Sequence, residues 1–179
     1  MRRFMALPCL LALTAPAVAA ETGKTYAELS AVYTFISDSG YEAYPGAIKL
    51  TVGHEFNDWL AAEAFAGTGI VDANFNVGAA SVNVRIDNLY GVYLRPFYKT
   101  PEGYEIFARA GYAHGRLSGS AVGPGGAISA SASDGSFSFG VGGAIPLSSS
   151  TKLTLDWMRY YQAQGTTING VGAGLRFHF

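Results

Sequence analysis

The feature that most constrains the fold is a strict alternation of apolar residues with small or polar ones. In residues 170–179, GVGAGLRFHF, the apolar parity is Val171, Ala173, Leu175, Phe177 and Phe179. A period of two places successive side chains on opposite faces of an extended strand. After the first twenty residues, no uninterrupted apolar run approaches the ~20 residues that a membrane-spanning helix needs. The pattern therefore predicts an all-β chain.

Eight segments carry this alternation and are predicted to be strands. They are 24–36, 47–56, 59–67, 82–94, 104–114, 136–147, 152–161 and 170–179. In 59–67 and 104–114 alanine replaces larger side chains, which leaves a helix as the alternative there. In 82–94 the pattern assigns Ile86 to the apolar, outward face.

The connections between these segments distinguish a soluble β-sandwich from a membrane barrel. Short connections at 57–58, 96–103 and 148–151 alternate with longer ones at 37–46, 68–81, 115–135 and 162–167. A sandwich has no reason for this asymmetry. Outer-membrane barrels have short periplasmic turns, long external loops and an even number of strands. The sequence therefore predicts an eight-stranded antiparallel up-and-down transmembrane β-barrel with both termini on the periplasmic side.

Aromatic residues gather near both ends of the predicted strands, as in the girdles that flank the apolar band of a membrane barrel. The predicted periplasmic girdle contains Phe56, Trp59, Phe97, Tyr98, Tyr104, Phe177 and Phe179. The predicted external girdle contains Tyr33, Phe35, Tyr112, Phe137, Phe139, Tyr160 and Tyr161.

The first twenty residues are predicted to be a cleavable signal peptide. A positive start precedes an apolar run, and small residues allow cleavage after Ala19 or Ala20. Residues 21–179 then form the barrel domain, which contains no cysteine because Cys9 is the only one. Ten basic and thirteen acidic residues remain, a balance that gives no sign of nucleic-acid binding.

The polar parity of the strands predicts a charged lumen. By parity the inward charges are Glu28, Lys49, Glu55, Glu63, Arg85, Asp87, Arg95, Glu105, Arg109, Asp156 and Arg176. An eight-stranded barrel is only just wide enough for side chains to fill it. We therefore expect these groups to pair and plug the lumen, and a narrow channel for small solutes is the alternative.

Catalytic and binding patterns are sparse. An enzyme that modifies lipid A is a second alternative, with His114 near Ser118 and Ser120, but no acid is evident beside them. No pattern indicates a cofactor or a metal ion, and we predict a non-enzymatic chain. Arg116 and Arg159 are expected near the outer leaflet, where each is a candidate to pair with lipopolysaccharide phosphates. Loop 115–135, rich in glycine, serine and alanine, is expected to be a flexible solvated segment whose alternation at 127–133 extends the strand at 136–147 above the membrane. A contact surface for host or environmental ligands is the alternative.

Several stretches resemble one known family. DGSFSFGVGG at 134–143, LTLDWMRYY at 153–161 and GLRFHF at 174–179 look like the small outer-membrane β-barrel proteins of Gram-negative bacteria, the opacity-protein and OmpA/OmpX-like group. The resemblance implies an outer-membrane location and a surface, envelope-integrity or adhesion-type role for a monomer. It also implies that the barrel-assembly machinery reads Leu175, Phe177 and Phe179 as an insertion signal.

Overall fold

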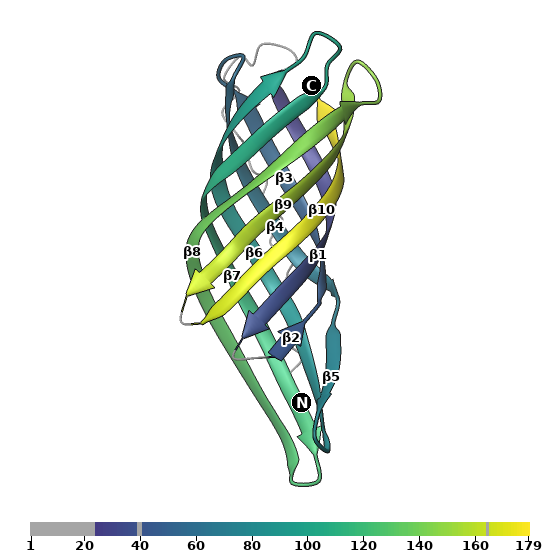
Figure 1. The fold of residues 1–179 in the computed structure, drawn as a ribbon, viewed down its shortest axis with the longest axis vertical. Helices are drawn as coiled ribbons and strands as arrows, with labels where there is room; N and C mark the ends of the chain where they lie inside the picture. Colours follow the sequence, from purple (N-terminus) through teal and green to yellow (C-terminus); the bar gives the residue numbers. More distant parts are fainter. Residues whose placement is uncertain (1–23, 39–40, 164) are drawn as a thin grey trace, which may run out of the picture.

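The computed structural model describes residues 24–38, 41–163 and 165–179, all as strands and connecting turns (Figure 1). The predicted signal peptide lies outside the described residues. The strands are β1 (Thr25–Asp38), β2 (Tyr41–Ala43), β3 (Gly46–Glu55), β4 (Leu60–Val71), β5 (Ala73–Val77), β6 (Ala80–Lys99), β7 (Glu105–Gly123), β8 (Gly126–Pro146), β9 (Thr151–Ala163) and β10 (Thr166–His178).

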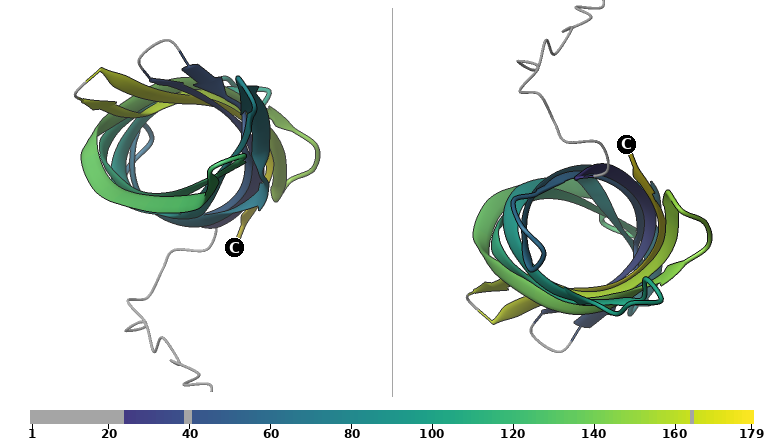
Figure 2. Two further views of the ribbon diagram at one scale, coloured as in Figure 1. Left: turned by 90° about the horizontal axis from the view of Figure 1, so that it is seen from below. Right: turned by 90° about the horizontal axis from the view of Figure 1, so that it is seen from above.

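Eight long strands form one closed antiparallel barrel, which confirms the predicted fold class. Each pairs with the next in the order β1, β3, β4, β6, β7, β8, β9 and β10. The last strand pairs with the first from Tyr26 opposite His178 to Asp38 opposite Thr166, which leaves no open sheet edge along the barrel wall. Figure 2 shows the resulting ring. The short strands β2 and β5 are additions that pair with β1 and β6.

The tight turns lie together at one end, and polar side chains fix two of them. The Asn57 side chain accepts hydrogen bonds from the amides of Trp59 and Leu60, at 3.0 and 2.8 Å. The Ser148 hydroxyl accepts one from the Thr151 amide at 3.1 Å. Such local bonds satisfy the backbone where the ladder stops, so the chain reverses within a few residues.

The opposite end differs in part from the prediction, although the expected extension of the strand at 136–147 through 127–133 is confirmed by β8. Residues 115–135 are not a flexible loop, because β7 continues to Gly123 and β8 begins at Gly126. With the outer part of β6 and with β5 they form a sheet that projects beyond the barrel (Figure 1). The alternation at 127–133 predicted the extension of β8, whereas residues 115–123 of β7, rich in glycine and serine, give no alternation between apolar and polar that predicts a strand.

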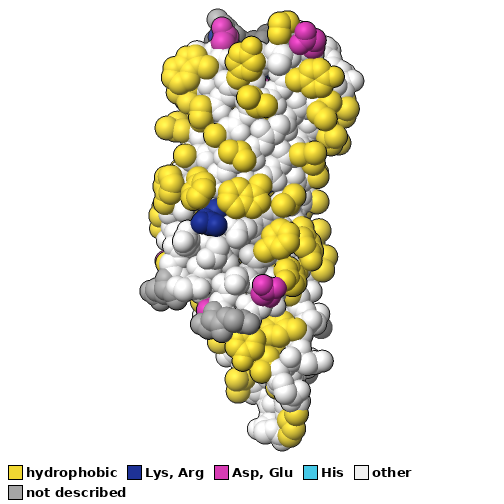
Figure 3. Space-filling model, in the orientation of Figure 1, with side chains coloured by type: hydrophobic (Ala, Val, Ile, Leu, Met, Phe, Trp, Pro, Cys, Tyr) yellow, Lys and Arg dark blue, Asp and Glu magenta, His cyan; other side chains and the backbone are white. Residues whose placement is uncertain are grey.

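Apolar side chains face outward over the barrel wall, as Figure 3 shows for one face. Leu50, Val92 and Leu155 each expose about half or more of their surface. In the part of the chain that the structure describes, no helix has the length and hydropathy to cross a membrane.

Two β-bulges change which side chains face inward. In β6 the register shifts between Ile86 and Asn88, so Ile86 is buried inside and the outward assignment was wrong. A second shift, where β9 meets Ile168 and Asn169 of β10, leaves Tyr160 without a partner in β10, and parity along β9 is interrupted only beyond this residue. An extra residue on one strand inverts the parity beyond it.

Two girdle assignments were wrong. Tyr160 faces the lumen because it shares the parity of Asp156 and Met158, and Phe97 faces it because it shares the parity of Arg95. Other predicted girdle residues are exposed on the outer wall, among them Trp59, Tyr98, Tyr112 and Phe137.

Candidate functional site

Nine of the eleven charged residues predicted for the lumen are buried inside the barrel. Every strand of the barrel wall except β8 supplies at least one of them. The nine are Glu28, Lys49, Glu55, Glu63, Arg95, Glu105, Arg109, Asp156 and Arg176.

Arg109 lies at the centre of this group. Its guanidinium donates to Glu63 at 2.5 Å from Nε, to Glu28 at 3.3 Å from Nη2, and to Asp156 from Nη1. The three carboxylates come from β4, β1 and β9. One side chain thus links strands on different sides of the barrel.

Arg176 and Arg95 extend the network toward the end with the tight turns. Arg176 donates to Glu28 at 2.8 Å and to Glu105 at 2.8 Å, and Arg95 also pairs with Glu105. The Phe107 ring lies 4.6 Å from the guanidinium carbon of Arg95 and 5.3 Å from that of Arg176. Guanidinium groups stacked on an aromatic face leave their edges free for carboxylates.

Further polar groups complete both ends of the network. Toward the projecting sheet, Lys49 lies 3.6 Å from Asp156 and donates to the Tyr160 hydroxyl at 3.3 Å. At the opposite rim Lys99 pairs with Glu55 at 2.6 Å, and Lys152 pairs with Glu105 at 2.9 Å.

Sequence reasoning missed four members of the network: Tyr26, Lys99, Lys152 and Tyr160. Tyr26 donates to Glu63 at 2.7 Å. The first three share the parity of Glu28, Arg95 and Asp156, so the alternation itself carried the signal. Tyr160 likewise shares the parity of Asp156 and Met158, so the alternation carried its signal too.

Two predicted members lie outside the network, and the prediction for Arg85 was wrong. The Arg85 side chain is 60% exposed on the outer surface, because the bulge in β6 turns it away from the lumen. Asp87, at the bulge, accepts a hydrogen bond from Ser118 and lies 3.7 Å from Arg116 and 3.9 Å from Arg85. These residues form a surface cluster beside the projecting sheet.

His114 has a different serine partner from those considered in the sequence. Its Nε2 lies 2.9 Å from the Ser133 hydroxyl on β8, while Ser118 bonds to Asp87. The adjacent Asp134 accepts a hydrogen bond from Tyr161 at 2.8 Å, which holds the pKa of this exposed carboxyl below its usual value. No group of three or more His, Cys, Asp or Glu side chains with the spacing to hold a metal ion occurs among the described residues.

Arg159 lies on the outer wall above two aromatic rings. Its guanidinium carbon is 5.7 Å from the Phe139 centroid and 5.8 Å from the Trp157 centroid, and its Nε donates to Asn169 at 3.1 Å. On the same wall, Leu175, Phe177 and Phe179 are outward-facing and exposed.

Comparison with protein families agrees with this geometry. Residues 5–179 match the model of the outer membrane protein beta-barrel domain. The chain belongs to this family. Its members lie in the outer membrane, so the apolar outer wall faces lipid and the ion pairs lie within a membrane barrel. Comparison with curated proteins finds none that matches.

Solved structures show that this outer-membrane barrel has relatives of the same fold. Ail, the attachment invasion locus protein of Yersinia pestis, solved with the heparin analogue sucrose octasulfate, superposes with a TM-score of 0.65 at 15% identity over 89% of this chain and 100% of that one. Neisserial surface protein A gives 0.65 at 13% identity over 89% and 99%. The N-terminal barrel of Pseudomonas aeruginosa OprF gives 0.56 at 15% over 89% and 100%.

Proposed function

We propose that this chain is a non-enzymatic surface protein of the outer membrane, with an adhesion-type role and a lumen closed by its own side chains. The projecting sheet carries the first part of the proposal. Among the described residues of β8, only Phe139–Pro146 pair with β9 through the backbone, and side chains link 134–138 to β9, so residues 126–133 have β7 on one side and no paired strand on the other.

This free edge suits recognition of a partner by strand addition. Its residues 127–133 read AISASAS and are exposed, without proline or charge. Proteins usually protect a long edge with lysine, proline or a bulge, because unpaired backbone groups accept another strand. Ail, which shares the fold, is named the attachment invasion locus protein.

The test is removal of the hairpin tip. A variant with residues 120–129 replaced by Asn-Gly shortens the sheet at the Gly119–Ala130 pair without touching the barrel. Proteoliposomes that carry it should lose attachment to an epithelial monolayer, while the barrel keeps its heat-dependent gel shift. A control that exchanges Ser129 with Ala130 preserves the backbone edge and should attach normally. Equal attachment by the truncated variant would contradict the proposal.

The closed lumen rests on the buried ion pairs around Arg109. An aqueous channel usually needs more strands than eight, and charges withdrawn from water must be paired. In planar bilayers the refolded protein should show no sustained openings. Replacing Glu28, Glu63 and Arg109 together with serine should produce them. Uniform, sustained openings of the unmodified protein would favour the narrow-channel alternative.

The absence of enzymatic activity is also part of the proposal. Asp134 accepts hydrogen bonds from Tyr161 and from the Gly135 amide, at 2.8 and 2.7 Å, rather than from His114, so among the described residues no carboxylate orients the His114–Ser133 pair. We expect the mass spectrum of lipid A to stay unchanged when the protein is overproduced. A new deacylated species that disappears in Ser133→Ala would assign catalysis to this pair.

We further propose that Arg116 and Arg159 contact lipopolysaccharide phosphates. Both side chains lie on the outer surface, and Arg159 stands over the aromatic pair Phe139 and Trp157. The unmodified protein should unfold at a higher temperature in lipopolysaccharide than in phospholipid. Replacing both arginines with Gln should reduce this difference. Replacing both with Lys keeps the charges and should retain most of it. An unchanged difference in the Gln variant would remove the assignment.

The proposed orientation places the tight turns and both termini in the periplasm and the projecting sheet outside. Ser149 lies in a tight turn and Ser129 in the projecting sheet, and both are exposed. On intact cells, an impermeant maleimide should label Ser129→Cys and not Ser149→Cys. The opposite labelling would reverse the orientation.

A further inference from the structure

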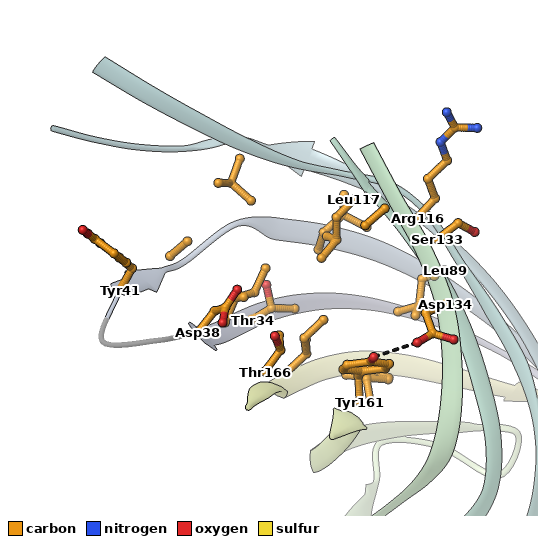
Figure 4. A pocket seen from close by; sticks show the side chains of 18 of the residues that line it. Thr34, Asp38, Tyr41, Leu89, Arg116, Leu117, Ser133, Asp134, Tyr161 and Thr166 are labelled. Carbon is orange, nitrogen blue, oxygen red and sulfur yellow. Dashed lines mark hydrogen bonds between the residues drawn. The ribbon is translucent and has the colours of Figure 1, made fainter. Parts of the chain in front are cut away.

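A cavity of about 900 Å³ lies at the mouth of the barrel, between the ion-pair network and the projecting sheet. We name it the outer vestibule. Figure 4 shows its side chains, which come from both ends of the chain and from the projecting sheet. Its size is that of a pocket for a small molecule.

The vestibule wall is mainly apolar. Val84, Leu117 and Ile168 are partly exposed and pack against the buried Ile36 and its neighbours, so each still presents apolar surface to the cavity. The charged side chains that line the vestibule, Asp38, Glu42, Arg116 and Asp134, are exposed, and Arg116 extends away from the other labelled side chains in Figure 4. Charged groups thus lie at the rim and apolar groups on the wall.

The vestibule also has a weak side wall between β8 and β9. Their ladder ends at Phe139 opposite Arg159. Beyond it the two strands are joined by side chains: Ser138 donates to the Arg159 carbonyl at 2.7 Å and Tyr161 to Asp134 at 2.8 Å. Along this seam the cavity is therefore bounded by side chains rather than by a backbone ladder.

We propose that the outer vestibule binds an uncharged apolar molecule, either a small aromatic compound or a single alkyl chain. Apolar cavities in proteins favour apolar ligands because water gains few hydrogen bonds there. Water and the outer leaflet are both sources of such a ligand. The inference does not depend on adhesion by the projecting sheet or on a closed lumen.

The experiment measures fluorescence of the apolar probe N-phenyl-1-naphthylamine with the whole barrel in nanodiscs, after subtraction of empty nanodiscs. The unmodified protein should show a saturable component. Val84→Trp fills the vestibule and should abolish it. Val92→Trp is the matched control, since Val92 is on the same strand but 60% exposed on the lipid-facing wall, and should retain it.

Leu117→Asn is a second vestibule variant, which adds a polar group without adding volume. It tests the site even where Val84→Trp fails to fold. It should weaken probe binding by about tenfold. No saturable component, or one that neither vestibule variant changes, would overturn the proposal. A lipid-free sample in amphipol separates the two sources: equal affinity indicates entry from water, whereas tighter binding than in nanodiscs indicates that a lipid chain competes for the vestibule.

Discussion

The guanidinium of Arg109 contacts carboxylates from three strands, and this makes it the residue on which the lumen most depends. A charge withdrawn from water costs several kcal/mol unless it is paired, and removing one partner leaves the others uncompensated. We expect Arg109→Met to lower the free energy of unfolding by about 3–5 kcal/mol. Urea unfolding of the protein in lipid vesicles measures this.

Arg85 provides the matched control because it is also an arginine on a wall strand but is 60% exposed. Its pairing with Asp87, at 3.9 Å, is screened by water, so Arg85→Met should change the free energy of unfolding by less than about 1 kcal/mol. Equal losses in the two variants would contradict the central role of Arg109.

At the scale of single strands, glycines give room for the large side chains of the lumen. Gly142 and Gly143 are neighbours in β8 but face opposite ways. A Cβ at Gly142 would lie 2.5 Å from the Phe107 ring and 2.6 Å from the Leu155 carbonyl, whereas one at Gly143 would meet only the Glu105 carbonyl at 3.4 Å. Phe107 cannot yield easily, because Arg95 and Arg176 stack on it.

Gly142→Ala should therefore destabilise the barrel by about 1–3 kcal/mol through overpacking. Gly143→Ala should be neutral or stabilise it by up to about 1 kcal/mol, since alanine costs less conformational entropy in a strand than glycine. Thermal unfolding followed by the gel shift distinguishes them. A larger loss of stability in Gly143→Ala than in Gly142→Ala would show that close packing against Phe107 is not the reason for glycine at the inward position 142.

The sequence predicts each strand up to the point where its parity breaks. Within the membrane the alternation is strict, because outward side chains must be apolar to face lipid whereas inward side chains are polar and fill the lumen. Most inward charges were therefore found from the sequence. Beyond Asp87 in β6 and Tyr160 in β9, a bulge inverts the parity, and an inserted residue leaves no mark in composition. In the projecting sheet, the alternation at 127–133 predicted the extension of β8, but the outer part of β7 was missed because its glycine and serine residues give no alternation. The partners of Arg109 depend on which strands lie across the lumen, which parity does not specify.

On the scale of the whole molecule, closure depends on β10, whose outer row ends at the rim where β1 begins. The amide of Phe179 donates to the Thr25 carbonyl at 3.0 Å, and its ring is exposed. We propose that Leu175, Phe177 and Phe179 act together as the insertion signal. On this proposal Phe179 contributes more to insertion in cells than to stability.

Phe56 lies among the rim aromatics too, with 58% of its surface exposed against 62% for Phe179, so the two rings bury similar area and differ in strand. Phe179→Ala and Phe56→Ala should therefore refold in detergent to the same extent. In cells, Phe179→Ala alone should lower the amount of protein in the outer-membrane fraction, because only β10 carries the proposed signal. Equal amounts of Phe179→Ala and Phe56→Ala in the outer-membrane fraction would contradict the proposed signal. They would show that a rim aromatic contributes only through its contact with lipid, whichever strand carries it.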